Sequence, residues 1–121
     1  MSKQTFGAAK VPLSPAVRAG DFVFISGQTP VDGDGNVVPG GIAAETDQVL
    51  QNVAAALALA GCDMSDVVKT TVWLRDRDDF ASFNEVYAKH FPSEPPARTT
   101  AESRLMIDIA VEIEAVAYKP L

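Results

Sequence analysis

Two periodicities of apolar residues along the chain predict its first elements. Residues 21–28 (DFVFISGQ) are rich in Phe, Val and Ile and are typical of a strand, as are residues 67–74 (VVKTTVWL). Strict alternation in the first strand places Ser26 on the face of its two phenylalanines and Gly27 on the other face. Between the strands, apolar residues recur at helical spacing over residues 42–60, which predicts a helix that Gly61 would end.

A turn and a second helix follow from the local composition. Residues 32–36 (DGDGN) predict a turn, because Gly, Asn and Asp accept positive φ, and residues 37–38 are expected to begin a return strand. The second helix is predicted over residues 79–91, with Asp78 as its cap and Pro92 at its end. Its aromatic residues lie on one side and favour a place in the core: Phe80, Phe83 and Tyr87.

The C-terminal part predicts two more strands, over residues 98–106 and 109–118, which form a candidate pair. The order of strands, helix, strand, helix and strands indicates an α+β fold, with two helices on one face of a mixed sheet. A length of 121 residues fits a single domain over residues 1–121.

The second face of such a sheet has no predicted helix to cover it. An open apolar face is most simply buried against other copies of the same chain, so we expect an oligomer. The candidates for this face are Thr70, Val72 and Leu74, or else Ile109, Val111, Ile113 and Ala115.

Charge and composition narrow the classes of function. The chain has 10 Lys and Arg against 16 Asp and Glu, a net charge of −6, which disfavours binding to nucleic acid. No segment is apolar enough for a signal peptide or a membrane span, so a cytoplasmic protein is expected. The single cysteine, Cys62, and the single histidine, His90, exclude an internal disulfide and a zinc cluster. No phosphate-binding glycine loop follows a strand, so no nucleotide cofactor is expected.

Two charged positions are candidates for chemistry. Arg98 follows the stiff pair Pro95-Pro96. It is either a solvated charge at a strand start or a guanidinium whose backbone the prolines fix toward one ligand. Glu112 and Glu114 share one strand face in an apolar run, so they mark either a solvated face or a site. A half-buried Glu would have a raised pKa suited to proton transfer near neutral pH.

Four other polar residues have simpler interpretations. Ser26 is typical of a strand end, and Asn84 is expected to be exposed on its helix, where Asn is a poor helix former. His90 fits a charge at a helix C-terminus, which the helix dipole favours. Cys62 lies in a helix-ending turn with no base nearby and is interpreted as structural.

Six segments, in order over nearly the whole chain, carry a resemblance to a known family. They are FISGQTP (24–30), QVLQNV (48–53), DVVKTTV (66–72), DFASFNEVY (79–87), PAR (96–98) and VEIEA (111–115). On these segments the chain resembles the RidA family, also called YjgF/YER057c/UK114 proteins. The resemblance implies a chorismate-mutase-like α+β fold. Three subunits would pack their sheets into a central barrel, with the helices outside and a ligand cleft at each subunit interface.

The resemblance also implies an activity. RidA enzymes hydrolyse enamines and imines, such as 2-aminoacrylate and 2-iminobutyrate, to 2-keto acids and ammonia. This removes reactive products of pyridoxal-phosphate-dependent dehydratases. Position by position, Arg98 matches the arginine that binds the substrate carboxylate, and Glu112 matches the glutamate associated with the attacking water. The other implied substrate-binding residues are Ser26, Gly27, Asn84 and Thr100.

Such an assignment is chemically coherent. A guanidinium holds a carboxylate through two parallel charge-assisted hydrogen bonds. A protonated imine is already electrophilic, so the reaction needs no cofactor and no covalent nucleophile. Glu112 would deprotonate the water and return a proton to the departing amine.

The chain departs from the family at three places. Thr100 stands where many members have a cysteine, which excludes thiol chemistry at that position. Ala16 stands in place of a cleft tyrosine, which removes a ring and a hydroxyl. The segment between Arg98 and Glu112 is one residue short, and a shift of one position turns a strand side chain to the other face.

Two other functions stay open beside the deaminase. A small-ligand sensor or protein-interaction module on the same trimer would need the cleft but no proton transfer. An endoribonuclease or translation inhibitor, a role also claimed for this family, is disfavoured by the net charge of −6.

Overall fold

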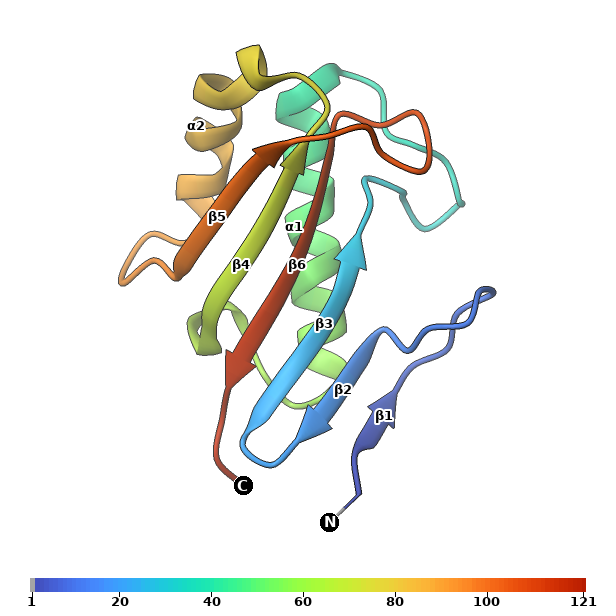
Figure 1. Cartoon of the computed structure of the whole chain (residues 1–121), viewed down its shortest axis with the longest axis vertical. Coiled ribbons are helices and arrows are strands. Elements are labelled where there is room, and N and C mark those ends of the chain that lie inside the picture. Colours follow the sequence, from blue (N-terminus) through green and yellow to red (C-terminus); the bar gives the residue numbers. More distant parts are fainter. Residues whose placement is uncertain (1) are drawn as a thin grey trace.

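Six strands form one mixed sheet, and two helices cover one of its faces (Figure 1). The computed structural model describes residues 2–121. The strand order is β1-β2-β3-β6-β4-β5, and all neighbours are antiparallel except β4 and β5. The predicted α+β architecture is confirmed. The elements are β1 (Gln4–Phe6), β2 (Ala16–Ala19), β3 (Phe22–Gln28), α1 (Gly41–Leu59), β4 (Val67–Leu74), α2 (Phe80–His90), β5 (Ala97–Glu102) and β6 (Val111–Tyr118), with short 3₁₀ turns at Met64–Asp66 and Arg77–Asp79.

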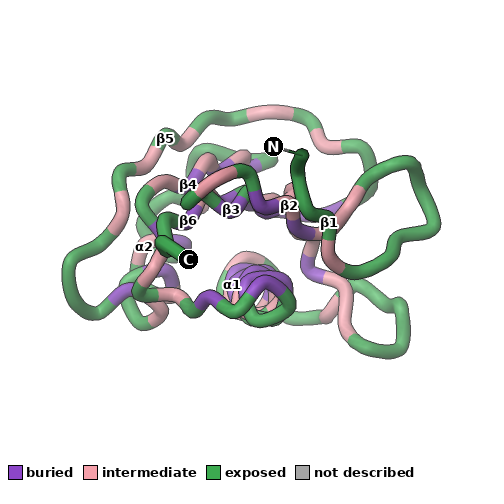
Figure 2. The backbone as a smooth tube through the Cα atoms, turned by 90° about the horizontal axis from the view of Figure 1, so that it is seen from below, coloured by how far each residue is buried: buried purple, intermediate pink, exposed green. Residues whose placement is uncertain are grey.

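The connections explain why both helices lie on the same face. Helix α1 joins β3 to β4, which run parallel with β6 between them, and α2 joins β4 to its parallel neighbour β5. Parallel strands need a crossover connection, and such crossovers are right-handed. Both crossovers step across the sheet in the same direction, so both place their helix on the same side (Figure 2).

The core lies between this face of the sheet and α1. The apolar residues predicted at helical spacing are fully buried there: Val49, Leu50, Val53 and Leu57. Gly61 follows the helix with φ of +77°, which confirms it as the end signal. In α2, Phe83 and Tyr87 are buried as predicted, whereas Phe80 begins the helix and stays 42% exposed. Among the described residues, no helix has the length and apolar character needed to cross a membrane.

The structure corrects the expectations for the N-terminal half. Strands β1 and β2 were not predicted, because QTF is short and mostly polar and AVRA is too short to show a period. The expected return strand at residues 37–38 is reduced to one isolated bridge between Val31 and Val37, since the chain turns into α1 instead.

The prediction that Asp78 caps the second helix is also wrong. A 3₁₀ turn precedes α2, and the side chain of Asp76 accepts the N–H of Asp78 to cap that turn.

The predicted pairing of the last two strands is wrong as well. Strand β5 ends at Glu102, four residues before the predicted end, and pairs in parallel with β4. Strand β6 begins at Val111, not at residue 109, and lies between β3 and β4. The crossover through α2 delivers β5 to the outer side of β4, so β4 separates the two strands.

The open face of the sheet carries different residues from those expected. Both predicted sets point toward the helices, where all of their members are buried: Thr70, Val72, Leu74, Ile109, Val111, Ile113 and Ala115. The open face instead includes Phe22, Phe24 and Tyr118, which are 43%, 48% and 45% exposed. Alternation shows which residues of a strand share a face, but it does not show which face the helices cover. In this sheet the helices cover the more apolar face, and the face with mixed polar and apolar residues is open.

Candidate active site

Arg98 lies on the helix side of β5 and is not a solvated charge. Its Cζ atom is 4.8 Å from the ring centroid of Tyr87 and 5.5 Å from those of Phe80 and Phe83. Its Nη1 donates a hydrogen bond of 2.9 Å to Oδ1 of Asn84. The contacts with three aromatic rings and the hydrogen bond to the Asn84 amide oxygen together hold the guanidinium in a single orientation. This is its one side-chain hydrogen bond among the described residues, so its other N–H groups stay available to an anion.

The surroundings of Arg98 are rigid. A cavity of about 490 Å³ beside it is lined by Asn84, Tyr87 and the Pro95-Pro96 pair. The Tyr87 hydroxyl lies 2.7 Å from the Thr70 hydroxyl in the interior, and burial raises the pKa of Tyr87. The contact with Thr70 therefore fixes the Tyr87 ring on which the guanidinium lies. The two prolines restrict the backbone just before Arg98.

Glu112 lies on the opposite, open face of the sheet, against Gly27. A Cβ atom at Gly27 would lie only 2.2 Å from Oε2 of Glu112, so the carboxylate occupies the space that any other residue would fill. Burial, and then the negative charge of Glu114, raise the pKa of Glu112 above its ordinary value. A cavity of about 180 Å³ adjoins the carboxylate and includes Trp73 and Arg104.

A β-bulge brings Gly27 to this position. Ile25 pairs with Ala115 but Gln28 pairs with Ile113, so the two residues between them on β3 oppose one residue of β6. The strict alternation predicted for this strand is therefore wrong from Gly27 onward, because Gly27 shares the open face with Glu112.

Ser26 fastens the bulge to the segment before β2. Its Oγ donates to the carbonyl of Ser14 at 2.6 Å, and its N–H donates to the carbonyl of Pro15 at 3.1 Å. Ala16 is fully buried opposite Ile25, so the interpretation of Ala16 as a cleft residue is wrong. The large exposed side chain of this segment is Leu13, at 49%.

Within a single chain, the predicted site residues lie in two separate groups. Arg98 is in register with Thr70, which is buried toward the helices, whereas Glu112 is in register with Trp73 on the other face. The two charged groups therefore lie on opposite faces of the sheet and line different cavities. The helix-side half-site contains Arg98, Asn84 and Thr100. The open-face half-site contains Ser26, Gly27 and Glu112.

Sequence reasoning missed the aromatic platform of the helix-side half-site. Phe80 and Tyr87 were interpreted as core residues, yet both rings lie under the guanidinium of Arg98. The spacing of the three aromatic residues of α2, with an arginine after the helix, was the available signal. Within residues 2–121 there is no cluster of three His, Cys, Asp or Glu side chains suited to a metal ion.

Comparisons with known proteins match this chain over nearly its full length. A family model described as Endoribonuclease L-PSP matches residues 3–119. The RutC family protein of Pyrococcus horikoshii is 51% identical over 110 residues, which cover 89% of this chain and 87% of that protein. The 2-iminobutanoate/2-iminopropanoate deaminase of Mus musculus is 44% identical over 114 residues, with 93% and 84% covered.

Solved structures agree with the fold. A putative endoribonuclease of Thermotoga maritima superimposes with a TM-score of 0.93 at 37% identity, with 98% of each chain covered. RidA from an Antarctic Psychrobacter species superimposes with a TM-score of 0.90 at 36% identity, with 95% of this chain and 98% of that chain covered.

Proposed function

Because the chain belongs to the RidA/YjgF/L-PSP family, we propose that it hydrolyses 2-imino and 2-enamino acids to 2-keto acids and ammonia. Relatives at 44% and 45% identity are named 2-iminobutanoate/2-iminopropanoate deaminases. The single observation that carries the proposal is the geometry of Arg98. Its guanidinium is stacked, bonded to Asn84 and open to a carboxylate.

Glu112 supplies the proton chemistry in this proposal. A 2-imino acid bound through its carboxylate presents the C=N carbon to water. Glu112 takes a proton from that water as the C–O bond forms to the protonated imine, which gives a carbinolamine. Glu112 then returns this proton to nitrogen, and the C–N bond breaks as the C=O bond of the keto acid forms. Ammonia leaves, and the hydroxyl proton passes to solvent. Burial and Glu114 raise the pKa of Glu112, which brings the carboxyl closer to the pH at which it can both accept and donate a proton.

The two half-sites act together only across an interface between two copies. Arg98 and Glu112 lie on opposite faces of one sheet, so a single chain cannot hold one small substrate between them. The open sheet face has exposed Phe22 and Phe24 available for burial against another copy. We propose a homotrimer in which the helix-side half-site of one chain meets the open-face half-site of the next.

Two inactive variants test both parts of the proposal. Arg98→Ala and Glu112→Gln are each expected to lower kcat/KM for 2-iminobutyrate by about two to three decades, because each removes one partner of a desolvated charge arrangement. The two variants are then unfolded together in equal amounts and refolded. In a closed ring, every mixed trimer has one interface with an intact Arg98 facing an intact Glu112.

Random mixing is expected to restore about one quarter of the wild-type activity, because three quarters of the trimers are mixed and each has one working site in three. Refolding each variant alone is the control and restores none. Full turnover by Arg98→Ala alone would contradict the deaminase assignment. Two inactive single variants that give no recovery on mixing would contradict the shared site.

The family description names an endoribonuclease. This chain has a net charge of −6, which weakens any binding to a phosphate backbone. We therefore do not extend an RNA-cleaving activity to it.

A further inference from the structure

The guanidinium of Arg98 faces the cavity of about 490 Å³ described above. Arg98 itself lines this cavity, together with its hydrogen-bond partner Asn84 and with Tyr87, on whose ring the guanidinium lies. An anion bound to the remaining N–H groups of Arg98 therefore lies at this cavity, and the rest of the bound molecule can extend into it.

The cavity continues along α2, past the guanidinium. Asn84, Ala88 and Phe91 all line it, and residues at this spacing follow one another on one face of a helix. The step from Asn84 to Phe91 corresponds to about 10 Å along the helix axis. A molecule held by its carboxylate at Arg98 therefore has about this length of cavity available for its side chain.

The wall of the cavity beyond Asn84 is apolar. It consists of Ala88 and Phe91 at the end of α2 and of Pro95-Pro96 in the loop before β5. Phe91 is buried, and its ring centroid lies 4.8 Å from that of Tyr87. The prolines have restricted backbones, so this part of the cavity has a fixed shape.

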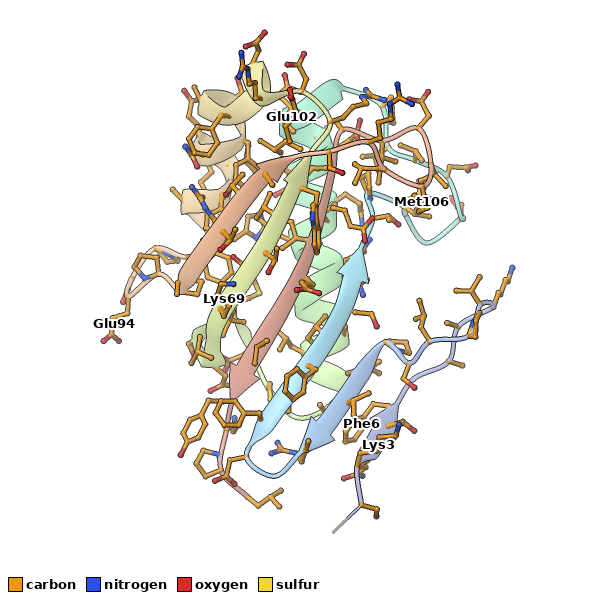
Figure 3. All side chains as sticks on the ribbon, viewed as in Figure 1. Lys3, Phe6, Lys69, Glu94, Glu102 and Met106 are labelled. Carbon is orange, nitrogen blue, oxygen red and sulfur yellow. The ribbon has the colours of Figure 1, made fainter. Side chains whose placement is uncertain are left out.

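Charge is confined to one end of the cavity. Among the described residues that line it, Arg98 is the only charged one. Glu94 comes directly before the prolines, but its side chain is exposed and points outward from the loop (Figure 3). A polar side chain in the apolar part would lose hydrogen bonds to water without gaining equivalent partners, whereas an apolar side chain would gain by leaving water.

We propose that this apolar part of the cavity receives the substrate side chain, so that the preferred substrates of the deaminase are 2-imino acids with branched or aromatic apolar side chains. This inference rests on the proposed function. The cavity of about 490 Å³ is larger than the ethyl side chain of 2-iminobutyrate requires. Each further methylene placed in an apolar pocket raises kcat/KM by about tenfold or more.

Two imines that differ in side-chain size test the inference. An amino acid oxidase converts leucine to 2-imino-4-methylpentanoate and 2-aminobutanoate to 2-iminobutyrate. Semicarbazide traps each imine, so a lower yield of semicarbazone reports hydrolysis by the protein. The wild-type chain is expected to prefer the leucine-derived imine by about tenfold or more in kcat/KM. Equal values, or a preference for 2-iminobutyrate, would overturn the inference.

A larger side chain at Ala88 fills part of the same space. Ala88→Leu is therefore expected to lower the ratio of the two kcat/KM values to about one. Ala58→Leu is the matched control, because Ala58 is an exposed alanine of α1 that lines none of the cavities described above. Leucine and alanine are both good helix formers, so both variants are expected to fold. A wild-type ratio in Ala88→Leu, or an equal fall in Ala58→Leu, would overturn the inference.

Calorimetric binding of stable 2-keto acids separates this inference from the proposed function. 4-Methyl-2-oxopentanoate is expected to bind the wild-type chain more tightly than the smaller 2-oxobutanoate and the charged 2-oxoglutarate, and Ala88→Leu is expected to remove the first difference. If neither imine is hydrolysed but these binding differences are found, the proposed function fails and the apolar side-chain site stands. If 2-iminobutyrate is hydrolysed but 2-oxoglutarate binds as tightly as 4-methyl-2-oxopentanoate, the apolar side-chain site fails and the proposed function stands.

Discussion

Replacing Gly27 with alanine is expected to displace the Glu112 carboxylate without unfolding the chain. The new Cβ would lie 2.2 Å from Oε2 of Glu112, so the oxygen has to move by about 1 Å to reach an ordinary contact. Gly27 does not have a positive φ, so alanine fits its backbone. The atom that must move is the end of a flexible side chain, so the free energy of unfolding should fall by less than about 1.5 kcal/mol.

A shift of this size is large for catalysis. Misplacing a reacting group by about 1 Å costs about a hundredfold in rate, so kcat/KM for 2-iminobutyrate should fall by about that factor in Gly27→Ala. Urea unfolding measures the change in stability. An assay in which semicarbazide competes with the enzyme for 2-iminobutyrate measures the change in kcat/KM. Gly33→Ala is the control, since a Cβ at Gly33 meets no atom within 4 Å and its φ is not positive.

A double variant decides whether the effect passes through Glu112. In a Glu112→Ala background the clash is absent, so adding Gly27→Ala should cause no further loss of kcat/KM. A wild-type rate in Gly27→Ala, or a loss that adds in full to that of Glu112→Ala, would refute the reasoning.

Three further changes have defined outcomes. Tyr87→Phe leaves the Thr70 hydroxyl buried without its partner, so urea unfolding should show a loss of about 1–3 kcal/mol; an unchanged midpoint would contradict this. Because the pKa of Glu112 is raised above 4.5, its contribution to stability is present below pH 4.5 and is lost as the pH rises through the raised pKa. Glu112→Gln should therefore gain stability relative to wild type between pH 4 and 7, and a difference that stays constant with pH would contradict the raised pKa. Glu114→Gln removes the neighbouring charge, so the acidic limb of the kcat/KM profile should move to lower pH, whereas a limb that stays in place would show that Glu114 has no effect on Glu112.

The chain shows which parts of a fold are readable from residue patterns. Helix α1 was predicted to within a residue at each end, because its periodic apolar positions and Gly61 are local signals. The pairing of β5 with β4 was not predicted, because it depends on where the crossover through α2 delivers the strand. Strand partners are set by the whole topology, and no local pattern reports them.

The candidate site likewise contains one residue that a local pattern identified and others whose positions no local pattern predicted. Arg98 was identified as a candidate from the prolines before it, and the structure holds it in one orientation. The face of Gly27 was predicted wrongly, because a bulge inserts a residue that alternation does not reveal. That Arg98 and Glu112 lie on opposite faces was equally hidden, since it depends on the register of three strands.

The back-to-back placement of Arg98 and Glu112 has a consequence for how turnover would depend on protein concentration. A separate chain would have no complete site, so specific activity would report the fraction of chains that are associated, and it would fall on dilution. By mass action, a substrate that contacts two chains at once also favours their association. The substrate would thus favour the assembly of the chains that hydrolyse it, and these chains would dissociate more readily once the substrate is consumed.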